Sequence, residues 1–379
     1  MKRAVRRVTR LGYKRLAKPV LFRQHPDGVH HRLIRAAKVV QKLPLARTLP
    51  RLWVHTSPAL KQEVWGLAVA NPVGLSAGFD KNIDIATVIR NVGFGFMIGG
   101  SVTAEPCDGN PKPWFYRLPH TKSLVVHAGL PNQGVRRIAR RLETYPRQVF
   151  ENFPLGVSVA KTNSKASVSE RAAIKDYCTS LSMLDTRNLG QFFEINISCP
   201  NTFGGEPFTT PEKLDRLLTK IDLLKLTRPV VVKMPLNLKD SDFDALLAVI
   251  VRHEVRGVTI ANLLRDREGV DSRDALPASI KGNLSGAPTR AKSTALIART
   301  YRQYGDRLTI IGVGGIFSAE DAYEKIRAGA TLVALITGMI FEGPQLVGEI
   351  NHGLEQLLKR DGYKTIADAV GIEAQKGVY

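Results

Sequence analysis

The feature that most constrains the fold is a regular alternation after residue 66, in which short apolar runs are separated by longer amphipathic segments. The apolar runs predict eight strands, at residues 72–77, 96–102, 155–160, 192–197, 230–234, 257–261, 309–313 and 332–336. Helical periodicity predicts eight helices, at residues 83–92, 135–143, 168–184, 212–224, 243–253, 290–304, 319–328 and 346–359. Eight strand–helix units over roughly 300 residues predict a (β/α)8 TIM barrel. A doubly wound sheet is the alternative, although no Gly-x-Gly-x-x-Gly follows the first strand.

The composition is that of a globular protein, with 44% hydrophobic and 23% charged residues among 379. Three scattered cysteines, Cys107, Cys178 and Cys199, do not provide a disulfide framework or a zinc site. We therefore expect a reducing compartment on the cytoplasmic side and no bound metal. The sequence shows neither an apolar run of membrane-spanning length nor a secretory signal.

Positive charge is concentrated at the N-terminus. Residues 1–50 hold 14 of the 55 Lys and Arg residues but only one of the 34 acidic residues, Asp27. Two short basic amphipathic helices are expected, within residues 1–20 and 28–42, separated by Pro19 and a turn at residues 25–28. Such helices can lie on an anionic membrane surface, or they can be a solvated basic pair that packs on the protein. Binding to nucleic acid is a third and weaker interpretation. We therefore divide the chain into a basic helical extension, 1–50, and a barrel, 51–379.

In a (β/α)8 barrel the chemistry takes place where the strands end at their C-terminal side. The segment 193–202 is such a strand end, and its Asn196, Cys199 and Asn201 bring two amides and an acid/base sulfur to one turn. Neighbouring amides and lysines are expected to favour the thiolate of Cys199. An ordinary turn with a buried cysteine is the competing interpretation.

Other strand ends carry lysines and glycines. Glycine-rich loops at residues 312–316 and 337–339 predict a phosphate cradle, although such glycines also serve tight turns. Lys233 ends an apolar strand and suits an anionic cofactor ring, whereas Lys81 follows Asp80 and is alternatively a structural, salt-bridged lysine.

Several long motifs, taken together, resemble dihydroorotate dehydrogenase over nearly the whole chain. They lie at residues 71–81, 196–202, 284–286, 292–294, 311–316 and 338–341. Residues 21–31 resemble the helical extension of the membrane-associated, quinone-dependent class (class 2).

The resemblance implies an FMN enzyme that oxidises dihydroorotate to orotate in pyrimidine biosynthesis. A hydride would pass from substrate C6 to flavin N5, and a proton from C5 to Cys199 as catalytic base. A quinone entering between the N-terminal helices would reoxidise the flavin. This implies a peripheral membrane protein on the cytoplasmic side, and no nucleic-acid partner.

The resemblance also implies binding residues. The orotate ring would be held by Lys81, Asn196, Asn201 and Asn262. FMN would contact Ala77, Gly78, Lys81, Ser101, Asn196, Lys233, Gly286, Gly315, Thr337 and Gly338.

Five positions depart from the quinone-dependent class. At position 199 the quinone-dependent class has Ser, whereas this chain has Cys199, the residue type that serves as the base in the soluble class. Val126 replaces a substrate-binding Asn, and Ser158 replaces a flavin-contacting Asn. Ala261 and Leu263 replace a Thr pair that flanks Asn262.

These departures leave three hypotheses open. The first is the quinone-linked dihydroorotate dehydrogenase. The second is a related flavin oxidoreductase with another dihydropyrimidine or acceptor, such as a tRNA-dihydrouridine-type reductase, whose charge should line the barrel mouth. The third is a flavin-binding protein without turnover. Such a protein would not need Cys199, Lys81 and Lys233 together, so their presence argues against it.

Overall fold

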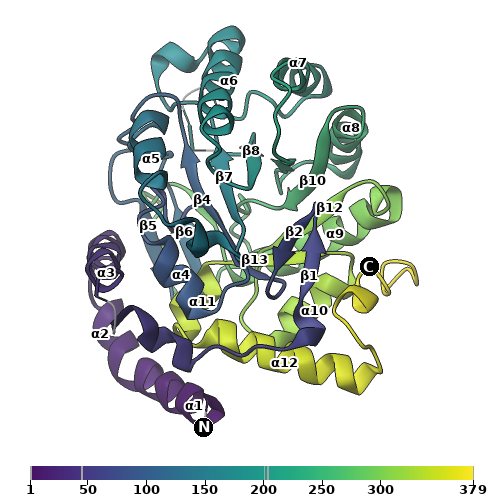
Figure 1. Ribbon diagram of the computed structural model, residues 1–379. Coiled ribbons are helices and arrows are strands. Elements are labelled where there is room, and N and C mark those ends of the chain that lie inside the picture. Colours follow the sequence, from purple (N-terminus) through teal and green to yellow (C-terminus); the bar gives the residue numbers. More distant parts are fainter. Residues whose placement is uncertain (1, 44–45, 200, 203–204, 379) are drawn as a thin grey trace.

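Eight parallel strands form a closed barrel in the computed structural model, which describes residues 2–43, 46–199, 201–202 and 205–378. The strands follow one another around the barrel in chain order, and the last pairs with the first (Figure 1). They are β3 (Val73–Leu75), β4 (Phe96–Val102), β7 (Leu155–Val159), β8 (Phe192–Asn196), β9 (Val230–Lys233), β10 (Val255–Ile260), β12 (Thr309–Val313) and β13 (Leu332–Leu335). The predicted (β/α)8 barrel is confirmed, and each predicted strand is present.

The predicted helices are also present and cover the outside of the barrel. They are α4 (Ala86–Val92), α5 (Val135–Leu142), α6 (Glu170–Thr186), α7 (Pro211–Asp222), α8 (Asp240–Ile250), α9 (Arg290–Tyr304), α10 (Ala319–Arg327) and α12 (Leu346–Asp361). A further short helix, α11 (Thr337–Glu342), follows the last strand. Local signals set several ends: Ser318 caps α10 by accepting a hydrogen bond from the Asp321 N–H at 3.2 Å.

The barrel interior is filled by side chains at its N-terminal end. Phe96 and Phe192 are buried there, and Gly156 on β7 makes room, because a Cβ at Gly156 would lie 2.3 Å from the Phe192 ring. A hairpin of β1 (Gln62–Val64) and β2 (Leu67–Val69) closes this end, with the Trp65 ring 5.3 Å from that of Phe192. The opposite, C-terminal end is therefore the one left for a ligand.

A small sheet and the N-terminal helices surround the C-terminal end. The sheet consists of β5 (Phe115–Leu118), β6 (Ser123–Val126) and β11 (Asn283–Leu284). The extension contains α1 (Lys2–Gly12), a π-helical segment (Tyr13–Ala17), α2 (Lys18–Phe22) and α3 (Pro26–Val40). α1 lies beside α12, the π-helical segment contacts α11 through Tyr13, and α3 packs against α2 and β5 (Figure 1). Among the described residues, no helix combines the length and apolar character needed to cross a membrane.

The extension is joined to the barrel by polar contacts at several points. The Tyr13 hydroxyl donates to the Ile340 carbonyl of α11 at 2.6 Å, and Lys38 pairs with Asp84 at 2.8 Å. The carboxylate of Asp27, at the start of α3, is buried. It accepts hydrogen bonds from the Trp114 and Phe115 N–H groups at 3.0 and 3.1 Å. These bonds fix α3 against the small sheet.

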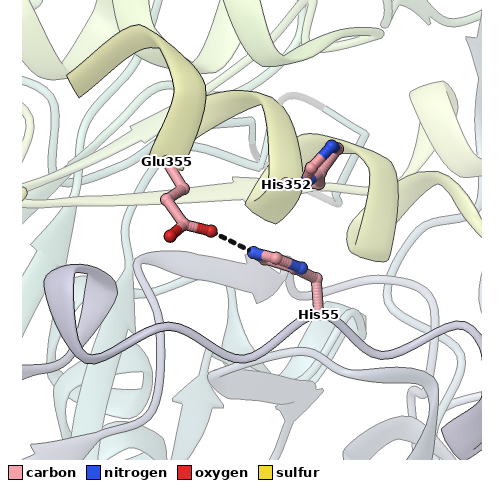
Figure 2. A group of neighbouring side chains, drawn as sticks. All are labelled: His55, His352 and Glu355. Carbon is pink, nitrogen blue, oxygen red and sulfur yellow. Dashed lines mark hydrogen bonds and ion pairs between the residues drawn. The ribbon is translucent and has the colours of Figure 1, made fainter. Parts of the chain in front are cut away.

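A cluster of His55, His352 and Glu355 attaches the segment after the extension to α12 (Figure 2). His55 Nε2 donates to Glu355 Oε2 at 2.6 Å, and the two imidazole rings lie 4.9 Å apart. The atoms of these three side chains that could bind a metal ion lie within 4.8 Å of one another. However, the second carboxylate oxygen of Glu355 accepts from Lys359 at 2.9 Å. Because both carboxylate oxygens already accept hydrogen bonds, we interpret the cluster as a structural contact and not as a metal site.

The Asp27 contact predicts a local effect on the extension. Asp27→Ala should remove two charge-assisted hydrogen bonds and weaken the docking of α3 by roughly 1.5–3 kcal/mol. Hydrogen exchange measured by mass spectrometry should become faster in residues 26–40, while exchange in the barrel strands stays slow. Unchanged exchange in α3 would show that these bonds do not hold it.

Candidate active site

A cavity of about 660 Å³ lies between the C-terminal end of the barrel and the N-terminal helices. Its lining includes all the site residues predicted from the sequence: Ala77, Gly78, Lys81, Ser101, Asn196, Cys199, Asn201, Lys233, Asn262, Gly286, Gly315, Thr337 and Gly338. The closed barrel brings these residues together, although they are spread over more than 250 positions of the chain.

Asn196 is held in one orientation at the end of β8. Its Nδ2 donates to Ser101 Oγ at 2.8 Å, and Ser101 Oγ lies 2.9 Å from the buried Ser158 Oγ. The Ser198 N–H donates to Asn196 Oδ1 at 3.3 Å. Ser158 thus supports Ser101 at the position where the sequence lacks the expected Asn.

Two lysines bring positive charge to the cavity. Lys233 is buried at the end of β9, in register with Asn196 on β8. Lys81 Nζ donates to the Gly78 carbonyl at 2.9 Å and lies 5.1 Å from the centre of the Phe115 ring. Burial lowers the pKa of Lys81 to about 8, against the opposing charges of Asp80 and Asp27.

Lys81 does not form the salt bridge with Asp80 that was the structural alternative for this lysine. The Asp80 carboxylate instead accepts the Asp84 and Ile85 N–H groups at 2.8 and 2.9 Å. Burial raises the pKa of Asp80 to about 6, and these two hydrogen bonds oppose the rise. Asp80 therefore shapes the loop, and Lys81 is directed to the cavity.

The amides of Asn262 and Asn201 are partly used by the protein itself. Asn262 Oδ1 accepts from the Leu236 N–H at 2.9 Å, and its Nδ2 donates to the Ser198 carbonyl. Asn201 Nδ2 donates to the Val126 carbonyl at 3.0 Å. Asn201 retains one N–H for a ligand, whereas Asn262 also hydrogen-bonds the Glu206 carboxylate and retains only a lone pair on Oδ1.

Cys199 lines the cavity, where its neighbours favour the thiolate as predicted but burial opposes it. Burial raises the pKa of the Cys199 thiol to about 11 and outweighs the Asn201 N–H and the charges of Lys233 and Lys161, which lower it. The neighbouring groups act in the predicted direction, but desolvation of the thiolate is the larger effect. Pro200, the next residue of the motif, lies outside the described residues.

The glycine loops form a tight surface at the ends of β12 and β13. Gly315 has a φ of +70°, and a Cβ there would lie 2.4 Å from Arg290 Cβ. A Cβ at Gly338 would lie 1.9 Å from the Ile316 carbonyl oxygen. Ser285 Oγ and Thr337 Oγ1 lie 2.9 Å apart beside these loops. Bared backbone N–H groups next to hydroxyls suit a phosphate group.

The second wall of the cavity was not predicted residue by residue. It includes Tyr13, Phe22 and His30 of the extension and Arg117 of β5. The Arg117 guanidinium lies 4.7 Å from the Phe22 ring centre and donates to the Gln24 carbonyl at 2.6 Å. Burial lowers the pKa of His30 to about 3. Helical periodicity indicates that the extension has an apolar face, but not which barrel residues that face meets.

A model of the family described as dihydroorotate dehydrogenase matches residues 59–358. The chain belongs to the dihydroorotate dehydrogenase family. It is 36% identical over 372 residues to a dihydroorotate dehydrogenase (quinone) of Deinococcus deserti, covering 96% of this chain and all of that protein. A protein of the same name from Gloeobacter violaceus is 35% identical, covering 94% of this chain and 98% of the relative.

Solved structures of the family agree with this assignment. The chain resembles dihydroorotate dehydrogenase from Eimeria tenella in complex with ferulenol, with a TM-score of 0.82 and 26% identity. The match covers 94% of this chain and 98% of that structure. The ligand-free form of the same protein gives a TM-score of 0.80.

The raised pKa of Cys199 predicts its reactivity in the isolated protein. Because the thiolate is the nucleophile, alkylation of Cys199 by iodoacetamide should be slow at pH 7 and become about tenfold faster with each pH unit up to pH 10. Mass spectrometry of the Cys199 peptide measures the rate, with glutathione as a control whose rate levels off above pH 9. A Cys199 rate that levels off near pH 8 would contradict the raised pKa.

Proposed function

We propose that this chain is a quinone-dependent dihydroorotate dehydrogenase that uses FMN. It oxidises dihydroorotate to orotate in pyrimidine biosynthesis and passes the electrons to a quinone. One observation carries the proposal: a single cavity joins the Asn196–Cys199–Asn201 turn, the glycine loops and the apolar inner face of the N-terminal helices. Substrate, flavin and quinone would thus meet in one enclosed space.

The residues at the barrel mouth fit FMN. The loops around Gly286, Gly315 and Gly338 suit its phosphate, and Lys233 supplies the positive charge that suits the ring edge where negative charge develops on reduction. Ala77, Gly78, Lys81, Ser101, Asn196 and Thr337 complete the proposed contacts. When bound, the flavin supplies a two-electron acceptor for the substrate and a donor for the quinone.

The chain's own residues would bind the substrate and take its proton. Lys81 would pair with the substrate carboxylate. This negative charge would stabilise the buried ammonium, whose pKa is lowered by burial. Asn196, Asn201 and Asn262 would hydrogen-bond the ring. Cys199 Sγ would accept the proton, and Lys233 and Lys161 favour the thiolate that this step requires.

The quinone would occupy the part of the cavity beneath the extension. Leu21, Val29, Leu33 and Ile34 of the N-terminal helices line this part, together with Met339 and Ile340 of α11. Its polar positions are few, and Arg117 provides a charged group beside them. An apolar chamber with a cationic group beside it suits an apolar molecule with polar carbonyls.

The outer surface of the extension supports peripheral attachment to a membrane on the cytoplasmic side. Val8 and Leu16 are 70% and 72% exposed, and Val20, Val39 and Leu49 are also exposed. Lysines and arginines lie among them, with 14 in residues 1–50. Apolar side chains entering the lipid interface and cations facing anionic headgroups would hold residues 1–50 at the surface, with the barrel, 51–379, in water.

Anaerobic mixing with dihydroorotate tests the enzymatic proposal. The purified protein should contain FMN, lose its flavin absorbance band on mixing, and recover the band when a short-chain quinone is added. Cys199→Ala should retain FMN and be reduced at least about a hundredfold more slowly, because it lacks the base.

Cys178→Ala, at a half-buried position of α6 that faces α7 and lies outside the cavity lining, is the matched control and should behave as wild type. A wild-type flavin that stays oxidised with dihydroorotate would refute the activity. Wild-type reduction of the Cys199→Ala protein would refute the base assignment alone.

Vesicle binding tests the membrane proposal. The double variant Val8→Ser, Leu16→Ser should bind vesicles of anionic phospholipid at least about tenfold more weakly in cosedimentation, since two apolar side chains no longer enter the interface. Leu223→Ser, at an exposed position that ends α7, should bind like wild type. Equal binding by all three proteins would show that Val8 and Leu16 do not hold the protein at the membrane.

A further inference from the structure

His127 occupies a position between two amide side chains, next to the site but outside the cavity lining. It follows Val126, the last residue of β6, and its own N–H donates to the Trp114 carbonyl at 2.8 Å. One ring nitrogen, Nδ1, lies 3.2 Å from Asn201 Oδ1. The other, Nε2, lies 3.3 Å from Asn110 Nδ2. The imidazole therefore bridges Asn110 and Asn201.

The far end of this bridge is fixed by a backbone carbonyl. Asn163 Nδ2 donates to the Gly129 carbonyl at 3.0 Å, which determines which end of the Asn163 amide is the donor. The same Nδ2 donates to Asn110 Oδ1 at 3.2 Å. Asn110 must then present its Nδ2 elsewhere, and that group also donates to the Asn201 carbonyl at 2.9 Å. Two backbone carbonyls thus set the orientation of the Asn110 amide.

That orientation determines the tautomer of His127. Because Asn110 Nδ2 is a donor, His127 Nε2 accepts, and the neutral ring carries its proton on Nδ1. The Nδ1–H group then donates to Asn201 Oδ1. At its other end the Asn201 amide donates from Nδ2 to the Val126 carbonyl. Each contact in the chain has one donor and one acceptor, so the Asn201 amide is held in one of its two flipped orientations.

The chain of contacts reaches Val126, where the family resemblance led us to expect a substrate-binding asparagine. The side chain of Val126 cannot offer the amide expected there, and its carbonyl holds Asn201 instead. We infer that His127 is a positioning residue that fixes the Asn201 amide for dihydroorotate and so compensates for the missing asparagine at 126. This inference rests on the proposed function, because Asn201 is its assigned ring-binding residue.

Three variants test the inference. His127→Phe keeps a ring of similar shape but removes both ring hydrogen bonds, so the KM for dihydroorotate should rise about five- to tenfold. His127→Gln can donate to Asn201 and accept from Asn110, so it should restore most of the loss. The matched control is His120→Phe, an exposed position in the loop between β5 and β6. Flavin content and thermal unfolding, measured for each variant, show that it is folded.

A readout beyond turnover separates positioning from general damage. The dissociation constant for orotate, measured from the change it produces in the flavin spectrum, should rise as much as the KM for dihydroorotate. The KM for the quinone should be unchanged, because the chamber beneath the extension does not include His127.

Each remaining outcome is decisive. A wild-type KM in His127→Phe would overturn the inference and leave the proposed function in place. Equal loss in His127→Phe and His127→Gln would also overturn it, since the hydrogen bonds would then be irrelevant. A wild-type flavin that dihydroorotate does not reduce would overturn the proposed function, and this inference with it.

Discussion

Closure of the parallel barrel is the constraint on which the remaining structure depends. Each strand hydrogen-bonds to the next in chain order, and β13 completes the ring by pairing with β3. The register of these pairs decides which side chains share a level: Asn196 and Lys233 are direct partners across β8 and β9. A shift of one residue would turn both side chains away from the interior. The geometry of the cavity thus follows from the backbone pairing of the strands that end in it.

Burial at the mouth of this barrel creates an electrostatic tension. The lowered pKa of Lys81, near 8, and the raised pKa of Cys199, near 11, both reflect the cost of placing charge in a poorly hydrated space. A carboxylate beside Lys81 would offset that cost for the lysine. The binding of an anionic substrate would therefore favour the charged form of Lys81.

The sequence predicts the barrel well because each strand–helix unit carries its own local signal. The apolar run ending at Asn196 and the capping Ser318 can be recognised without any neighbour. The same holds for the list of site residues, which the strand ends and the family motifs locate. The pairing of Asp27 with the Trp114 and Phe115 N–H groups is different, because it joins residues almost ninety positions apart. The net pKa of Cys199 likewise depends on how completely other elements cover the thiol, which residue types do not reveal.

The N-terminal extension supplies one wall of the cavity as well as an outward apolar surface. Its sequence is therefore constrained on its inner face as well as on its outer face. Its inner residues, such as Val29 and His30, are subject to the shape of the reaction chamber, while Val8 and Leu16 on the outside are subject to the surrounding medium. Replacing α1 to α3 with an unrelated amphipathic helix would remove this wall and open the cavity. The inner and outer faces of α1 to α3 should consequently diverge at different rates among relatives, with the inner face changing in step with the barrel rim.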